Sequence, residues 1–434
     1  MATNSYPPDG WQFVKLRALG EVNRGRSRHR PRYAEHLYGG PYPFIQTGDI
    51  KASGGRITKY TQTYSAAGLA QSRLWPAGTV CITIAANIAE TGILEFPACF
   101  PDSVIGFVAD PAKCDAHFIE YVFRRLRRQI QHEATGSVQD NINLATLDRL
   151  ALPLPPLQEQ KAIAHVLGTL DDKIELNRRM NETLEAMARA IFKSWFVDFD
   201  PVRAKVEGRQ PFGMDAATAA LFPDSFEDSP LSKIPEGWKA TTLPEAFEIN
   251  PLRALSKGQE TTYLDMQNMP TRGHRPLGWI HRRFVSGSKF TNGDTLIARI
   301  TPCLENGKTA FVDFLKEGEI GWGSTEFIVL RPRRPLPPEY GYCLARDQEF
   351  RDFAIQNMTG SSGRQRVPTD CFAQYPSVLP AEAIARRFGE IVRPLFAIVK
   401  SNSEEASTLT AIRDALLPKL ISGEIRVDPR EFKD

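Results

Sequence analysis

Arginines in alternate positions mark the first segment that could bind a polyanion. Every second position between residues 24 and 32 is basic, which gives Arg24, Arg26, Arg28, Arg30 and Arg32. Guanidinium groups neutralise DNA phosphates and pair through two hydrogen bonds with guanine in the major groove. A solvated surface loop has the same composition. The run is therefore a candidate DNA contact with that alternative open.

A second group of candidate DNA contacts lies in the other half of the chain and comprises Arg272, Arg275, Arg364, Gln365 and Arg366. The last three follow a Gly-Ser-Ser-Gly sequence, whose small residues let a backbone approach a ligand closely. Arg-Gln-Arg then supplies donors for base edges. The matching loop of the first half holds Gln139 and Asn141, whose amides suit adenine. The alternative is a polar turn that satisfies its own backbone.

Catalytic and cofactor motifs are absent from the sequence. Gly307-Lys308-Thr309 resembles the end of a phosphate-binding loop, but Pro302 stands where that motif needs its first glycine. The chain has no glycine-rich dinucleotide fingerprint, no Asn-Pro-Pro-aromatic tetrapeptide and no H-E-x-x-H arrangement among its seven histidines. Asp198 and Asp200 are more typical of a solvated helix end than of a metal pair. We therefore expect a binding protein that carries no catalytic group, metal or cofactor of its own.

The charge of the chain is nearly balanced. The formal net charge is +3 at pH 7, with 24% charged and 42% hydrophobic residues, so a positive surface must be local. The six cysteines form no C-x-x-C pair, which argues against a disulfide framework or a zinc knuckle. We find no signal peptide and no apolar run long enough to span a membrane. The composition predicts a cytoplasmic protein of roughly two to four domains.

Short motifs occur twice in the same order, about 225 residues apart. The pairs are Gly10-Trp11 with Gly237-Trp238, Thr135-Gly136-Ser137 with Thr359-Gly360-Ser361, Leu154-Pro155 with Leu379-Pro380, and Ile163-Ala164 with Ile384-Ala385. Each half begins with a stretch rich in Gly, Pro, Thr and aromatic residues and contains short strand-like runs, such as residues 79–84 and 326–330. Each half closes with a long helical pattern. The chain is predicted to be an internal duplication.

The two helical patterns have a spacing that alternates between four and three residues, which is typical of a coiled-coil seam. The seam positions are Ile163, Leu167, Leu170, Ile174, Asn177, Asn181, Leu184, Ala188, Ile191 and Trp195 in the first half, and Ile384, Phe388, Ile391, Leu395, Ile398, Asn402, Glu405, Leu409, Ile412 and Leu416 in the second. Asn181 and Asn402 occupy equivalent positions. Pro394 is expected to kink or interrupt the second helix.

These patterns predict an α+β fold with a pseudo-two-fold internal repeat. Two β-rich domains are each followed by a long helix, and the two helices pack as an antiparallel coiled coil. The expected boundaries are 1–155 and 237–378 for the β-rich domains, 156–200 and 379–425 for the helices, 201–236 for a linker and 426–434 for a tail. The prolines of the linker predict an irregular connection with a short helix around residues 216–221. Packing of each helix on its own domain alone is the alternative.

Several motifs resemble the DNA-specificity subunits of type I restriction-modification systems. The segments that carry the resemblance are residues 44–50, 154–160, 193–201, 221–225, 234–238, 298–302 and 413–425, and together they extend over nearly the whole chain. The resemblance adds Gln46, Thr47 and Arg299 to the candidate DNA contacts, because they lie in two of these segments. It implies that the β-rich regions are target-recognition domains, each of which reads one half of a split site in double-stranded DNA.

The same resemblance implies partners and their cofactors. The helical regions would form the spacer between the target-recognition domains and dock two modification (methyltransferase) subunits, which restriction or motor subunits join. S-adenosylmethionine, ATP and Mg are then expected on those partner subunits. Three other functions stay open: the specificity module of another methyltransferase or restriction system, a coiled-coil scaffold that reads no DNA, and a methyltransferase or nuclease with degenerate motifs.

Overall fold

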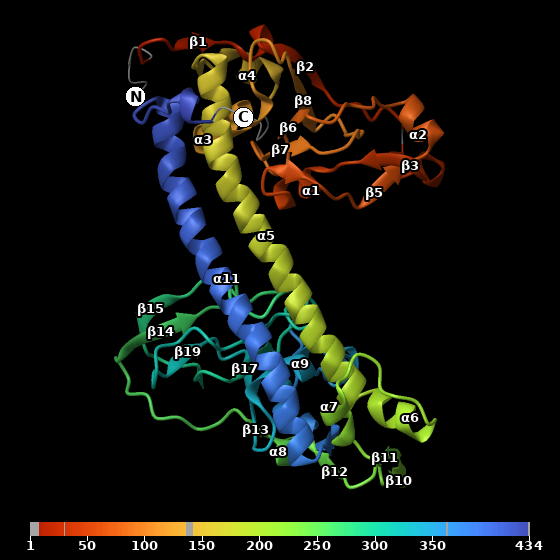
Figure 1. The fold of residues 1–434 in the computed structure, drawn as a ribbon. Helices are drawn as coiled ribbons and strands as arrows, with labels where there is room; N and C mark the ends of the chain where they lie inside the picture. Colours follow the sequence, from red (N-terminus) through yellow and green to blue (C-terminus); the bar gives the residue numbers. More distant parts are fainter. Residues whose placement is uncertain (1–7, 30, 136–141, 362, 433–434) are drawn as a thin grey trace. The chain divides into compact units, whose positions relative to one another are not determined.

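Two compact units make up the chain in the computed structural model, which describes residues 8–29, 31–135, 142–361 and 363–432. Unit 1 comprises Met1–Ile174 and Thr408–Asp434, and unit 2 comprises Glu175–Ser407. Two long helices, α5 (Leu157–Phe196) and α11 (Glu382–Ser422), each contribute one end to unit 1 and the other to unit 2 (Figure 1). Within the described ranges, no helix is long and apolar enough to cross a bilayer.

Unit 1 contains a five-stranded sheet in the order β2-β8-β6-β7-β4. The strands of this sheet are β2 (Gly20–Arg24), β8 (Val104–Ala109), β6 (Val80–Thr83), β7 (Thr91–Leu94) and β4 (Arg56–Ile57). Besides the long helices, the remaining elements are β1 (Gln12–Val14), η1 (Leu16–Ala18), η2 (Glu35–Leu37), β3 (Tyr38–Phe44), α1 (Thr47–Ala52), β5 (Gln62–Tyr64), α2 (Ala66–Ala70), α3 (Ala116–Thr135), α4 (Leu144–Arg149), β9 (Leu152–Leu154) and η4 (Pro429–Phe432). Every residue of β6 and β7 is buried, and α3 packs against both strands.

Unit 2 contains two four-stranded sheets, in the orders β13-β20-β17-β18 and β15-β14-β19-β16. The strands are β13 (Phe247–Ile249), β20 (Phe327–Pro332), β17 (Thr295–Ala298), β18 (Thr309–Phe311), β15 (Ile280–Arg283), β14 (Glu260–Leu264), β19 (Gly321–Gly323) and β16 (Ser288–Phe290). The remaining elements of the domain are β12 (Lys239–Thr242), α8 (Leu243–Ala246), α9 (Pro338–Arg346), α10 (Gln348–Gln356), η3 (Thr369–Gln374) and β21 (Pro376–Leu379).

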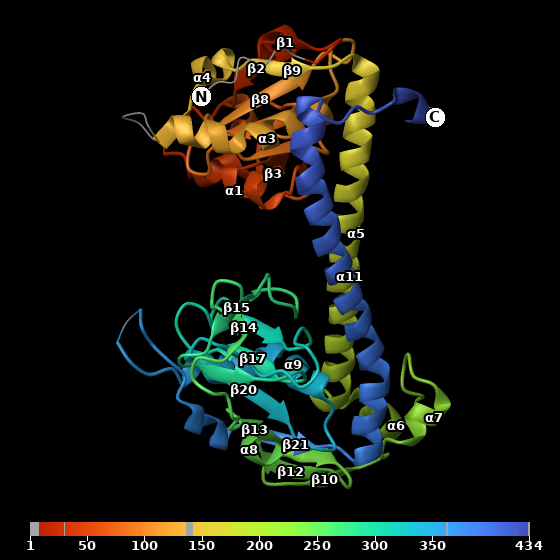
Figure 2. The same cartoon turned by 90° about the vertical axis from the view of Figure 1, so that its left-hand side faces the viewer.

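The two units repeat one topology, which confirms the internal duplication. Strands β2-β8-β6-β7 of unit 1 have the same order and antiparallel pairing as β13-β20-β17-β18 of unit 2. Figure 2 labels β2 and β8 of the first set and β13, β20 and β17 of the second. The pair β1-β9 brings the two ends of the first domain together, and β12-β21 does the same for the second. The repeated tryptophans Trp11 and Trp238 are both buried beside these pairs.

The linker is more ordered than its prolines predict. It contains α6 (Asp200–Val206), the expected short helix as α7 (Ala216–Ala220), and a hairpin of β10 (Phe226–Asp228) and β11 (Lys233–Pro235). Val202, Phe222 and Ile234 are buried in the same core as Trp195 of α5. The prediction of an irregular connection was wrong, because apolar residues between the prolines pack against the end of the helix.

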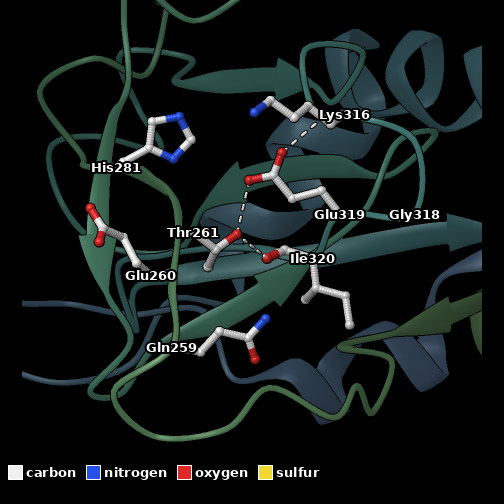
Figure 3. Close-up of a pocket in the computed structure, with 8 residues that line it drawn as sticks. All are labelled: Gln259, Glu260, Thr261, His281, Lys316, Gly318, Glu319 and Ile320. Atoms are coloured by element: carbon white, nitrogen blue, oxygen red, sulfur yellow. Dashed lines mark hydrogen bonds between the residues drawn. The ribbon is translucent and has the colours of Figure 1, made fainter.

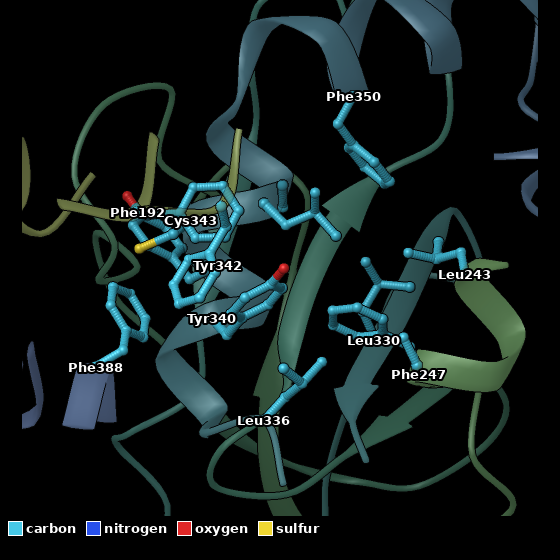
Figure 4. Packing of buried hydrophobic residues seen from close by; sticks show 14 of the residues in the cluster. Phe192, Leu243, Phe247, Leu330, Leu336, Tyr340, Tyr342, Cys343, Phe350 and Phe388 are labelled. Carbon is cyan, nitrogen blue, oxygen red and sulfur yellow. The ribbon is translucent and has the colours of Figure 1, made fainter. Parts of the chain in front are cut away.

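In unit 2, α5 and α11 lie side by side and run antiparallel. Phe388 packs against Phe192, with ring centroids 6.2 Å apart (Figure 4). It also packs against Trp195, with ring centroids 6.1 Å apart. Further along, Asn402 Nδ2 donates to Asn181 Oδ1 at 2.9 Å, and Asn177 Nδ2 donates to Glu405 Oε2 at 2.8 Å. Positions that rise along α5 thus meet positions that fall along α11, which confirms the antiparallel prediction.

In unit 1, the other ends of the two helices share one core. Ile163 and Leu167 are fully buried and pack with Leu420 and Ile421 of α11. Beside this core, Asp171 accepts hydrogen bonds from Arg413 of α11 at 2.7 Å and from Arg124 of α3 at 2.9 Å. The helices therefore pack both on each other and on their domain.

The predicted seam fits α5 better than α11. All ten seam positions of α5 are buried or half-buried. On α11, Ile398 and Ile412 are 42% and 43% exposed, whereas Phe396 and Val399 are buried. The predictions for Ile398 and Ile412 as seam residues were therefore wrong, because α11 also buries a neighbouring face against its domain. Helix α11 continues through Pro394, so the proline does not interrupt it.

The Asn181–Asn402 pair yields a test of the seam. We expect Asn402→Leu to cost about 1 kcal/mol of unfolding free energy, because it removes the donor from a half-buried Asn181 oxygen. The double variant N181L/N402L should recover that loss, since it removes both members of this amide pair together. Urea denaturation of the three proteins measures both effects. Equal stability of all three would place these residues in bulk solvent.

Candidate nucleic-acid interface

In unit 1 the basic run forms a fixed, extended segment that follows β2. Arg24, Arg26 and Arg28 are exposed, whereas Gly25 and Ser27 between them are buried, so the three arginines share one face. Gly25 N donates to Val104 O at 2.8 Å, and Arg26 N donates to Phe100 O at 3.1 Å. A Cβ atom at Gly25 would lie 2.3 Å from Pro101 O, which explains the glycine in this close approach.

Only part of this run is paired within the protein. Arg32 Nη2 forms an ion pair with Asp102 at 3.0 Å, and Arg24 Nε donates to the Asp102 carbonyl at 3.0 Å. Among the residues that the structure describes, no acidic group pairs with the side chains of Arg26 and Arg28. These two guanidinium groups are the ones most accessible to a phosphate. Arg30, Gln139 and Asn141 lie outside the described residues.

Gln46 and Thr47 lie at the start of α1, near a hollow. Gln46 Nε2 donates to Gln62 Oε1 at 2.6 Å, and its backbone N donates to Asp49 at 2.8 Å. Gln62 also lines a hollow of about 380 Å³ together with Tyr33, Glu35, Tyr38 and Gly39. Tyr33 is 80% exposed at its edge. Our sequence reasoning missed Gln62 and Tyr33, since no motif marks either residue.

In unit 2 the structure brings four predicted residues together. We call residues 359–361 and 363–367 the Arg366 loop. Backbone hydrogen bonds of 2.9 Å in both directions between Thr359 and Arg366 close this loop. Gln365 O accepts from Thr301 N at 3.0 Å, and Val367 N donates to Arg299 O at 2.9 Å. Arg299, Arg364, Gln365 and Arg366 thus form one cluster. Gly360 and Gly363 have φ values of +120° and +77°, which favour glycine.

Two arginines of this cluster differ in their pairing. Arg366 Nε donates to both carboxylate oxygens of Glu326 at 2.9 and 3.0 Å, and its Nη2 lies 2.8 Å from Oε1. Arg364 is exposed, and the described residues include no partner for its guanidinium. Glu326 was missed at the level of sequence because it lies 40 positions from Arg366. No local pattern joins the two.

The basic residues around Gly273 are divided between solvent and the interior. Arg272 is exposed. The side chain of Arg275 is only 7% exposed, forms ion pairs with Asp313 at 3.2 Å and Glu404 at 3.3 Å, and donates to the Lys400 carbonyl at 2.9 Å. We therefore assign Arg275 a structural role at α11 in place of the DNA contact expected from the sequence.

His274 lies at the centre of a buried polar network that joins the domain of unit 2 to α5. Its ring nitrogens lie 3.0 Å from Glu185 Oε1 and 3.2 Å from Asp313 Oδ2, and its backbone N donates to Glu185 at 2.7 Å. Tyr342 Oη donates to the other oxygen of Glu185 at 2.9 Å. The ring stacks on Phe396 of α11 with centroids 4.7 Å apart.

A further hollow in unit 2, of about 340 Å³, is lined by two carboxylates, Glu260 and Glu319 (Figure 3). Glu319 accepts hydrogen bonds from Thr261 Oγ1 at 2.9 Å, Thr262 N at 3.0 Å and Lys316 N at 3.0 Å. Burial alone would raise the pKa of Glu319, but these hydrogen bonds lower it to about 2. Glu319 therefore acts as a fixed anion that holds the surrounding turn. The described residues contain no cluster of His, Cys, Asp and Glu suited to a metal.

Comparison with known proteins places the chain among its relatives. Residues 8–186 match the family described as the type I restriction modification DNA specificity domain. The type I restriction enzyme MjaIX specificity subunit of Methanocaldococcus jannaschii is 24% identical over 444 aligned positions, which cover 97% of this chain and 95% of the relative. The HindI specificity subunit of Haemophilus influenzae is 27% identical over 351 positions, which cover 68% of this chain and 73% of the relative.

A solved structure has the same fold. The S subunit of a type I restriction-modification system from M. genitalium superposes with a TM-score of 0.55 at 17% identity, covering 97% of this chain and 98% of that one. The resemblance first indicated by the sequence motifs is confirmed. Residues 8–186 match the type I restriction modification DNA specificity domain, and the chain along nearly its whole length is similar to a type I restriction enzyme specificity subunit.

Proposed function

We propose that this chain is the non-catalytic DNA-recognition subunit of a type I restriction-modification complex and acts in the cytoplasm. Its two β-rich domains read the two halves of a split site in double-stranded DNA. The observation that carries the proposal is the duplicated domain, because each copy bears exposed guanidinium groups on a loop that the backbone fixes in place: Arg26 and Arg28 in unit 1, and Arg364 in unit 2. A fixed loop of this kind suits readout of a groove.

Modification subunits are the partners that we propose for the long helices. Helix α5 exposes an apolar stripe of Leu176, Met180 and Met187, which are 51%, 40% and 49% exposed. The spacing puts the three side chains on one helix face, next to the seam. We call them the docking stripe. Two modification subunits bind the complex, restriction or motor subunits join them, and S-adenosylmethionine, ATP and Mg are bound by those partners.

Methylation mapping tests the proposal. The chain is expressed with its modification subunit in cells that lack other methylation, and modified positions are read across the genome. We expect a bipartite motif with two constant halves. An unmethylated genome, or methyl transfer by the purified chain alone, would overturn the proposal. Methylation without a split motif favours the specificity module of a different system, and complex formation without DNA binding favours a scaffold.

Substitutions in the two loops should affect different halves of the motif. We expect Arg366→Ala to weaken binding to the second half-site and Arg26→Ala to weaken binding to the first, by about 1–3 kcal/mol where the arginine reads a base. Competition with DNA in which one half-site is scrambled separates the two effects. Equal loss on cognate and random DNA would assign the arginine to a phosphate.

A further inference from the structure

We propose that Glu326 is a specificity-determining positioning residue, which holds Arg366 so that it reads a guanine in the second half-site and does not grip a phosphate. The inference rests on the proposed function and specifies guanine as the base that the Arg366 loop contacts. It begins with the ion pair itself. Glu326 takes the Nε–Nη2 edge of the guanidinium with contacts of 2.8–3.0 Å, and the two side chains are 24% and 44% exposed.

Two N–H groups of Arg366 are not engaged by the residues that the structure describes and can bind a ligand. A guanidinium has five N–H groups in a fixed plane. Nε and one Nη2 hydrogen face Glu326, and Nη1 donates one hydrogen to the Arg364 carbonyl at 3.2 Å. Two hydrogens remain, one on each Nη atom. A donor on each of two adjacent nitrogens suits the O6 and N7 acceptors of guanine.

Both members of the ion pair are fixed through their backbones. Arg366 exchanges two hydrogen bonds with Thr359, and the carbonyl of Glu326 accepts from Arg299 N at 2.9 Å. Glu326 N also donates to Ser324 Oγ at 3.1 Å. The reading edge is therefore aligned before DNA arrives, so that binding loses little side-chain entropy.

The negative charge of Glu326 makes Arg366 favour a base over a phosphate. The Glu326 carboxylate neutralises Arg366 and repels an approaching phosphate, whereas guanine offers uncharged acceptors. Arg364, which has no acidic partner among the described residues, is left to contact the DNA backbone. Repulsion of the wrong ligand is a recognised source of specificity.

The test uses the complex with the modification subunit and the site that methylation mapping gives for it. We expect Glu326→Gln to raise affinity for random DNA, and to steepen the salt dependence by about 0.9 in the log–log slope, since one more phosphate is neutralised. The preference for the cognate site over DNA with a scrambled second half should fall about tenfold. Glu248→Gln is the matched control, because Glu248 pairs with Arg333 at 3.1 Å on the exposed surface of unit 2.

A second variant separates positioning from structure. In an Arg366→Gln background, Glu326→Gln should change neither the salt slope nor the site preference, because Glu326 acts only through Arg366. A loss of the same size in that background, or an unchanged salt slope in E326Q itself, would overturn the inference. If wild-type complex shows no preference for any site, the proposed function fails; if it does and E326Q behaves like E248Q, only the role of Glu326 fails.

Discussion

Replacement of His274 by Phe should lower the free energy of unfolding by about 3–5 kcal/mol near pH 6, the usual cost of removing one partner of a buried ion pair. His274 is fully buried between Glu185 and Asp313. A phenylalanine ring would still stack on Phe396. The Glu185 carboxylate would lose the imidazole and keep the Tyr342 hydroxyl and the backbone N–H of residue 274 as hydrogen-bond donors. Urea denaturation measures the loss.

The same variant has a pH dependence with a definite sign. Burial by itself would lower the pKa of His274, but hydrogen bonds and charge interactions with Asp313 and Glu185 outweigh it and raise the pKa above its ordinary value of 6.5. A raised pKa in the folded state gives stability that is fully present below pH about 6.5 and is lost as the pH rises through the raised value. The pKa of Glu185 is lowered, so its contribution is constant in this window.

The difference between wild type and His274→Phe should therefore be largest near pH 6 and smaller in alkaline solution. His281→Ala is the control, because His281 lies exposed on the edge strand β15 and should show neither effect. An equal cost at both pH values would mean that the ring is neutral, and that hydrogen bonding alone holds the network together.

Charge in the docking stripe should abolish assembly. We expect M180E/M187E to weaken binding of the modification subunit more than about a hundredfold, because each carboxylate would be desolvated at the centre of an apolar contact, where hot-spot losses reach about 2 kcal/mol or more. The stability of the chain itself should change little, since both methionines are 40–49% exposed. Co-purification and methylation in cells measure the loss.

Ala186→Glu is the matched control for the docking stripe. Ala186 is exposed on the same helix, about 100° around the axis from Met187. Its variant should assemble and methylate normally. Normal assembly of M180E/M187E would move the docking surface elsewhere on the helices, whereas equal failure of A186E would indicate a general effect of acidic charge on α5.

Sequence periodicity predicts the fold well where one physical constraint dominates. Ile163 and Leu167 repeat with the seam because one helix face is buried along its length. The pattern fails at Ile412, because α11 must bury two faces at once and the heptad describes only one. A different prediction fails at Val202 and Phe222. The prolines there predict a loose linker, but apolar side chains contribute to a core.

The candidate site was predictable in its basic residues and not in its acidic ones. Arg364 and Arg366 stand out beside glycines that allow a tight loop, whereas Glu326 and Asp102 become visible only through contacts with residues 40 and 70 positions away. Arg275 shows the reverse. Its type suits DNA, but Asp313 and Glu404 neutralise it inside the fold. Ion pairs with residues far away in the sequence decide which arginine remains available to DNA. Composition alone does not reveal these pairs.

The division of each long helix between two units has a consequence for synthesis on the ribosome. The residues that cover Ile163 and Leu167, among them Leu420 and Ile421, emerge only after Glu175–Ser407 has been translated. At roughly 5–20 residues per second, that delay lasts about 10–50 s. Unit 2, whose chain is continuous, can fold first, while the apolar face of the earlier helix waits uncovered. The nascent chain is therefore a natural client for chaperones during this interval, and a premature stop before residue 408 leaves exposed the part of that face which α11 would cover.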